Sequence, residues 1–150
     1  MFLCNNKGSW NTSNVTDMNT MFRSATNANP DTSGWNTSSV TTMSSMFRVA
    51  PNANPDTSGW NTSNVTSMAF MFSGATSANP IMSSWNFSKV TNMSNIFSTS
   101  VPLSVSNYSD MLNQINATSA QTSITLSDTS AQYRVNPFIP DNLVRLQHFR

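Results

Sequence analysis

Large apolar side chains recur along residues 10–100 at a fixed interval of 25 positions, separated by Asn, Ser and Thr. The interval is marked by Trp10, Trp35, Trp60 and Trp85; by Val15, Val40, Val65 and Val90; by Met18, Met43, Met68 and Met93; and by Phe22, Phe47, Phe72 and Phe97. A period between 20 and 50 residues is typical of repeat proteins, in which each unit buries its apolar face by stacking on its neighbours. The pattern therefore predicts four stacked units that share one narrow core.

The spacing within one unit predicts its secondary structure. Val40, Met43, Met46, Phe47 and Ala50 follow one another at steps of 3, 3, 1 and 3, which favours one face of a short helix. The preceding segment 29–35 begins with turn residues and leads into a short extended stretch. We therefore expect an α/β repeat solenoid of the leucine-rich-repeat kind, with one short parallel strand and one short helix per 25-residue coil. The alternative is an all-β solenoid.

The same pattern divides the chain into four parts. Residues 1–9 are a partial repeat or the N-terminal end, and residues 10–100 are four tandem repeats. Residues 101–135 are expected to form a C-terminal capping unit, because a repeat stack needs a different unit to cover its open apolar end. A helical face in this unit is predicted from Tyr108, Met111, Leu112 and Ile115, followed by a last strand at 123–127. Residues 136–150 are a tail whose expected structure is a helix starting at Asp141.

Composition narrows the classes of partner. Charged residues are 9% of the 150 residues and the net charge is +1, so the chain offers no basic stripe for nucleic acid. No apolar run is long enough to span a membrane, and the sequence contains no signal peptide. The expected partners therefore include neither nucleic acid nor a membrane span.

Residues able to support catalysis or metal binding are few. Cys4 is the only cysteine and His148 the only histidine, and they lie at opposite ends of the chain. Asp31 and Asp56 occupy equivalent repeat positions and would stack as like charges, but the series ends at Ile81, so solvated turn residues are expected rather than a cation site. We therefore expect no enzyme activity, no cofactor and no metal site.

The repeat resembles that of the BspA-like leucine-rich-repeat surface proteins. The blocks that carry the resemblance are "WNTSNVTDMNTMFRSA" (10–25), "WNTSSVTTMSSMFRVA" (35–50), "WNTSNVTSMAFMFSGA" (60–75) and "WNFSKVTNMSNIFSTS" (85–100). The resemblance implies a leucine-rich-repeat fold, an extracellular or cell-surface location and a role in adhesion. One departure is that Thr32 and Thr57 stand where repeats of this family often carry a large apolar residue.

These observations favour a non-catalytic surface or secreted module that binds a protein or a glycan. The candidate binding face consists of the polar residues around the predicted strand, namely Ser33, Asn36, Ser58 and Asn61. One alternative is a structural spacer or assembly element of a larger surface or viral protein, with end-to-end self-association through the N-terminal edge. A second alternative is ice binding through Thr12, Thr37 and Thr62.

Overall fold

The computed structural model describes residues 10–97, 101 and 103–118, which contain one helix and no strand. The helix is α1, Val105–Thr118. Among these described residues, the only bridges between extended backbone segments are the isolated parallel pairs Asp17–Thr42, Thr42–Ser67 and Ser67–Asn92. The predicted α/β repeat solenoid with a strand and a helix in every coil is therefore wrong. The all-β alternative is wrong for the same reason.

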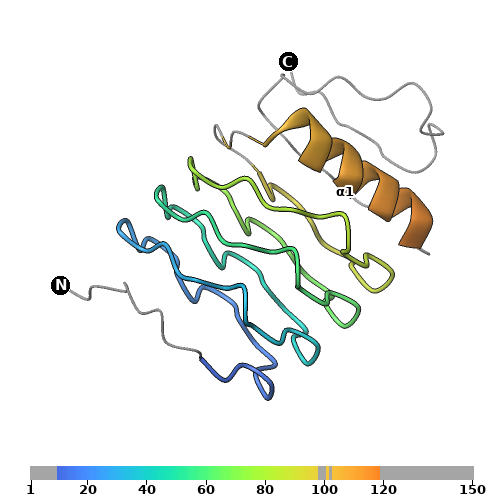
Figure 1. Ribbon diagram of the computed structural model, residues 1–150, viewed down its shortest axis with the longest axis horizontal. Helices are drawn as coiled ribbons and strands as arrows, with labels where there is room; N and C mark the ends of the chain where they lie inside the picture. Colours follow the sequence, from blue (N-terminus) through green and yellow to red (C-terminus); the bar gives the residue numbers. More distant parts are fainter. Residues whose placement is uncertain (1–9, 98–100, 102, 119–150) are drawn as a thin grey trace.

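The repeat instead forms stacked coils made of turns (Figure 1). Coil 1 is residues 10–34, coil 2 is 35–59, coil 3 is 60–84, and coil 4 begins at residue 85 and is described to residue 97. Backbone hydrogen bonds join residues of adjacent coils, for example the N–H of Met43 to the carbonyl oxygen of Ser67 at 3.0 Å. The 25-residue interval is therefore the length of chain that returns to the same place one coil further along.

The segment predicted as a helix is a series of tight turns. From residue 43 to 50 the backbone N–H groups alternate between two kinds of acceptor. Those of Met46, Arg48 and Ala50 donate to the carbonyl three residues earlier, as in a single turn. Those of Met43, Ser45, Phe47 and Val49 donate to the carbonyls of coil 3, at Ser67, Ala69, Met71 and Ser73. Since repeated three-residue turns bring apolar positions to one face at nearly helical spacing, the sequence pattern imitates a helix.

Left-handed backbone conformations interrupt any helix at one position in all four coils and at a second position in coils 1 to 3. The first position is occupied by Thr20, Ser45, Phe70 and Asn95, with φ between 55° and 59°. The second is occupied by Ser24, Val49 and Gly74, with φ of 58°, 56° and 77°. A β-branched residue is sterically disfavoured in this region, whereas glycine enters it without penalty. Val49 is thus a strained site in a turn where coil 3 carries glycine.

Replacing Val49 by Gly is expected to raise the free energy of unfolding by about 0.5–1 kcal/mol, the relief of strain exceeding the entropic cost of glycine. The Val49 side chain is half exposed, so little buried area is lost. The reverse change, Gly74→Val, is expected to destabilise. Urea unfolding of the parent and of both variants measures the two changes in the free energy of unfolding. A Val49→Gly protein less stable than the parent would show that Val49 is not strained.

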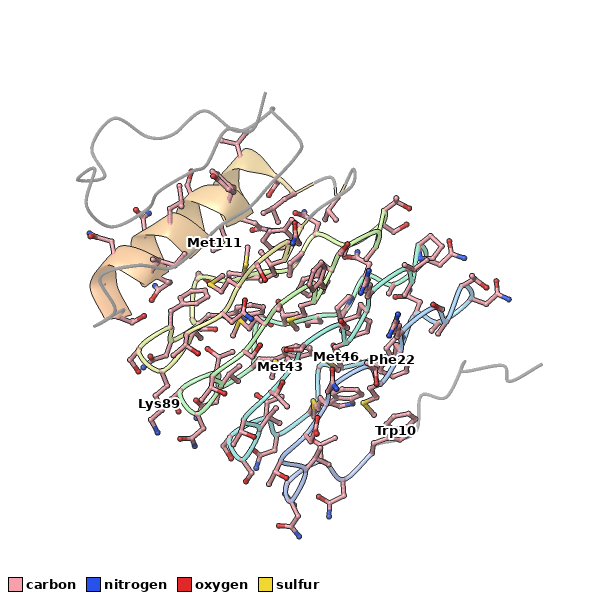
Figure 2. All side chains as sticks on the ribbon, turned by 180° about the vertical axis from the view of Figure 1, so that it is seen from behind. Trp10, Phe22, Met43, Met46, Lys89 and Met111 are labelled. Atoms are coloured by element: carbon pink, nitrogen blue, oxygen red, sulfur yellow. The ribbon has the colours of Figure 1, made fainter. Side chains whose placement is uncertain are left out.

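Aromatic side chains stack from coil to coil through the core. The ring centroids of Phe47 lie 5.3 Å from those of Phe22 and 5.6 Å from those of Phe72, with nearly parallel planes. The rings of Trp35 and Trp60 are 6.2 Å apart and almost parallel. Figure 2 shows Met43 and Met46 inside the same stack. Because each ring of the inner coils is covered by its equivalents on both sides, a few large residues per coil suffice to fill the interior.

Threonines complete this interior with hydrogen bonds between coils. The Oγ1 of Thr37 donates to the carbonyl oxygen of Asn61 at 3.0 Å and accepts from the N–H of Asn61 at 2.8 Å. Thr12 and Thr62 make the same pair of bonds to the next coil. Thr32 and Thr57, both fully buried, donate to the carbonyl oxygens of Asp56 and Ile81. Threonine is therefore tolerated in the core because its hydroxyl pairs backbone groups of the neighbouring coil.

Helix α1 lies across the end of the stack formed by coil 4 (Figure 1). Met111, Leu112 and Ile115 are buried in the same core cluster as the coils, which confirms the helical face predicted for them. Thr118 accepts a hydrogen bond from the N–H of Phe87 at 2.8 Å, which joins the end of α1 to coil 4. The expected partial repeat at 1–9, the strand at 123–127 and the tail at 136–150 lie outside the described residues.

Candidate functional site

Exposed small and polar residues lie beside the buried Trp35 and Trp60, where coil 1 passes into coil 2 and coil 2 passes into coil 3. We call this set the polar strip and define it by two equivalent sets of residues: Asp31, Ser33, Gly34 and Asn36, where coil 1 passes into coil 2, and Asp56, Ser58, Gly59 and Asn61, where coil 2 passes into coil 3. All eight are exposed, whereas the intervening Thr32, Trp35, Thr57 and Trp60 are buried. The four residues predicted from the sequence, Ser33, Asn36, Ser58 and Asn61, all lie on this strip.

Each asparagine of the strip is held in one orientation by its own turn. The Oδ1 of Asn36 accepts from the N–H of Ser38 at 3.0 Å and from its hydroxyl at 2.7 Å. The Oδ1 of Asn61 accepts from the N–H of Ser63 at 3.0 Å. Such turns, in which an Asn oxygen binds the backbone two residues on, fix the side chain locally. Since the amide oxygens are occupied, the Nδ2 groups remain as donors for an external acceptor.

The serines of the strip offer different chemistry. Ser33 donates both its N–H and its hydroxyl to the Oδ1 of Asp31, at 3.1 and 2.7 Å. Ser58 makes the same two bonds to Asp56, at 3.0 and 2.7 Å. Because each hydroxyl proton is committed, these serines can only accept hydrogen bonds from a ligand. The strip therefore presents amide donors from Asn and oxygen acceptors from Ser and Asp.

Asp56 stays ionised over the ordinary pH range. The hydroxyl and the backbone N–H of Ser58 lower its pKa, while burial and the neighbouring charge of Asp31 oppose the shift. Because the pKa of Asp56 is lower in the folded chain than in the unfolded chain, ionised Asp56 stabilises the fold at any pH above the ordinary pKa of an aspartate. This stabilisation is lost as the pH falls through the lowered pKa of the folded chain. The strip accordingly carries negative charge at neutral pH.

The two glycines, Gly34 and Gly59, leave unfilled space between the aspartates and the asparagines of the strip. A Cβ atom added at Gly34 would meet no atom within 4 Å, and one added at Gly59 would meet only the carbonyl oxygen of Ser33 at 3.8 Å. Neither glycine has a positive φ. A side chain introduced here would fold without strain and project over the strip, which makes these positions suited to blocking a ligand.

The sequence pattern missed the aspartates and glycines as members of the strip. The aspartates could have been found from the sequence, because D-T-S at 31–33 has the same pattern as N-T-S at 36–38. In both triplets a side-chain oxygen stands two residues before a serine and accepts its hydrogen bonds. The glycines carry no such signal because only the structure shows the space above them.

The threonines suggested for ice binding face the interior. Thr12, Thr37 and Thr62 are at most 3% exposed, and their hydroxyls are bonded to the next coil. They therefore form no surface array, and ice binding through them is excluded.

Among residues 10–97, 101 and 103–118 there is no group of three or more His, Cys, Asp or Glu residues able to hold a metal ion. Asp31 and Asp56 both lie on the strip, bonded to the serines described above. Cys4 and His148 fall outside the described residues. The arrangement of the strip is suited to reversible hydrogen bonding.

Within the described part of the chain, no helix combines the length and the hydrophobicity required to cross a lipid bilayer. No curated protein and no solved structure matches the chain. A family model described as "Mycoplasma protein of unknown function, DUF285" matches residues 2–108, which include all four repeats and the start of α1. This match supports, at a coarse level, the BspA-related resemblance of the repeat blocks. The chain belongs to the DUF285 family of Mycoplasma proteins of unknown function.

Proposed function

We propose that the chain is a non-catalytic binding module of a surface or secreted protein, and that it recognises a protein or glycan ligand through the polar strip. Membership of the DUF285 family is consistent with a surface-associated repeat protein. The observation that carries the proposal is the pair of asparagines, Asn36 and Asn61, whose oxygens are fixed by their own turns and whose Nδ2 groups have no hydrogen-bond partner among the described residues.

This arrangement supports binding because its donors are ordered before a ligand arrives. A long polar side chain loses conformational entropy when a ligand immobilises it, whereas a side chain already fixed by a turn loses less. The repeat places equivalent donors, Asn36 and Asn61, and equivalent acceptors, Ser33 and Ser58, one coil apart, which suits an extended ligand. Apart from the aspartates of the strip the chain carries few charges, so hydrogen bonds are expected to contribute more to binding than ion pairs.

The double variant Asn36→Asp, Asn61→Asp is expected to weaken ligand binding at least tenfold. Aspartate keeps the oxygen that the turn requires, so folding is retained, but it replaces both amide donors with acceptors. The ligand is first identified by presenting the purified chain to a glycan array and a panel of extracellular-matrix proteins. Affinity for the strongest ligand is then measured by biolayer interferometry for the parent and the variant.

Asn92 provides the matched control. Its Oδ1 accepts from the N–H and the hydroxyl of Ser94 in the same kind of turn, but it lies outside the strip. Asn92→Asp is expected to change affinity less than twofold, and Gly34→Gln is expected to reduce it by covering the strip. Equal affinity of the parent and the double variant would remove the strip as the binding site. Absence of any ligand would favour the structural spacer.

A further inference from the structure

The two copies of the polar strip, residues 31–36 and 56–61, lie on directly adjacent coils. The Oγ1 of Thr32 in the first copy donates to the carbonyl oxygen of Asp56 in the second at 2.6 Å. Parallel bridges pair the same coils elsewhere along their length. Since segments paired in this way lie about 4.8 Å apart, the equivalent donors and acceptors of the two copies are separated by about that interval.

An extended peptide does not match this interval. Its side chains recur on one face every ~6.6 Å, so a peptide seated on the first copy would miss the second by roughly 2 Å. A peptide cannot pair here as a further strand either, because the N–H groups of Ser33, Trp35 and Asn36 already donate within the chain. The strip therefore favours a ligand whose repeating unit is about one coil in length.

A hexose ring in a linear glycan has such a length. Single bonds of about 1.5 Å give a six-membered ring that is joined at opposite positions a length on the order of 5 Å. Its hydroxyl groups both donate and accept hydrogen bonds. The second copy offers both partners, since the Nδ2 of Asn61 donates while the carboxylate of Asp56 and the hydroxyl oxygen of Ser58 accept. One copy can therefore bind the hydroxyls of one sugar.

The charge of the strip selects among glycans. Hydrogen bonds from Ser58 lower the pKa of Asp56, and the charge of Asp31 is near enough to oppose this shift. Two neighbouring carboxylates would repel a glycan that carries sulfate or carboxylate groups. A neutral glycan is therefore favoured.

We propose that the polar strip binds a neutral linear glycan, which lies along the stack with one sugar at each copy. This inference rests on the function proposed above and specifies its ligand. Gly34 and Gly59 place no side chain between the acceptors and the donors, which leaves room for the sugar ring.

The next repeat carries an incomplete copy of the strip. Ile81 stands where the other copies have aspartate and is 41% exposed, and Ser83 follows it at the same spacing. Ser84 replaces the glycine, and its hydroxyl donates to the carbonyl oxygen of Ser58 at 3.0 Å, so its side chain is held against the preceding coil. Asn86 keeps its Oδ1 bound within its own turn. The third copy therefore lacks mainly the carboxylate acceptor.

Completing the third copy tests the proposal. Isothermal titration calorimetry measures the affinity of the parent and of Ile81→Asp for β-1,4-linked oligomers of glucose, mannose and N-acetylglucosamine, two to six sugars long. Ile81→Asp is expected to raise the affinity at least fivefold for oligomers of three or more sugars, which reach the new acceptor. Two-sugar oligomers only gain a second place to bind, so their affinity is expected to rise at most about twofold.

Ile81→Ala is the matched control, because it removes the isoleucine without adding an acceptor, and it is expected to leave both affinities unchanged. Should Ile81→Asp fail to fold, Ile81→Asn supplies the same acceptor oxygen without the charge. Equal gains for short and long oligomers would overturn the proposal. Tighter binding of heparin than of every neutral oligomer, or binding of no neutral oligomer, would overturn it as well.

The failure of this proposal and that of the proposed function give different results. A matrix protein whose affinity falls in the Asn36→Asp, Asn61→Asp variant, with no neutral oligomer bound, would keep the strip as the binding site and overturn the glycan. Neutral oligomers that bind the parent and that double variant equally would remove the strip itself, and both proposals with it.

Discussion

The Phe47→Ala protein is expected to lose about 3–5 kcal/mol of its free energy of unfolding, the usual cost of removing a fully buried aromatic side chain. Phe47 has no exposed surface and lies between the rings of Phe22 and Phe72. Its removal therefore opens a cavity at the junction of three coils, which the neighbouring rings cannot fill without leaving their own stacking positions. Urea unfolding followed by circular dichroism measures the loss.

Phe22→Ala is the matched comparison. Phe22 occupies the same repeat position, but in the first coil it has an equivalent phenylalanine on one side only. Its loss is expected to cost clearly less, since an outer coil can separate locally while the others remain stacked. Equal losses for the two variants, or a loss below about 1 kcal/mol for Phe47→Ala, would be inconsistent with a core built by stacking equivalent residues.

The Thr37→Val protein is expected to lose about 2–4 kcal/mol, because two backbone groups of the next coil would be left without a partner. Valine has nearly the shape of threonine, so packing changes little. The lost hydroxyl, however, donates to the carbonyl oxygen of Asn61 and accepts from its N–H. Thr37 is 1% exposed, so water replaces neither bond without opening the coil. The same unfolding measurement gives the effect.

Thr41→Val is the control for this change. Thr41 is exposed, and although its hydroxyl donates to the carbonyl oxygen of Thr16, its backbone N–H donates to the same oxygen. Its replacement is expected to cost less than about 1 kcal/mol. A Thr37→Val protein as stable as the Thr41→Val protein would show that the buried hydroxyls do not join the coils.

The length of the repeat could be predicted from the sequence, but its secondary structure could not. The 25-residue spacing of Trp35 and Trp60 identified residues that stack in the structure. The steps between Val40, Met43 and Met46 were interpreted as a helix, because tight turns and helices produce nearly the same apolar spacing. The difference is set by alternate N–H groups that donate to the next coil, and such long-range pairing leaves no local pattern in the sequence.

The binding face was predicted in part for a related reason. Exposed polar residues beside each tryptophan identified Asn36 and Asn61, which the structure places on one strip. Composition could not separate them from Thr12 and Thr37, which are equally polar in sequence and buried in the structure. What distinguishes the two sets is the bonding partner, a residue of the same turn for Asn36 and a residue of the next coil for Thr37.

The most direct test of the stacked coils is a nuclear Overhauser measurement on the isotopically labelled chain. Contacts are predicted between the rings of Trp35 and Trp60, and between those of Phe47 and Phe72, whose centroids are 6.2 and 5.6 Å apart. The account also predicts no continuous series of helical contacts over residues 40–50. Absence of the ring contacts, together with an unbroken helical series in that segment, would contradict it.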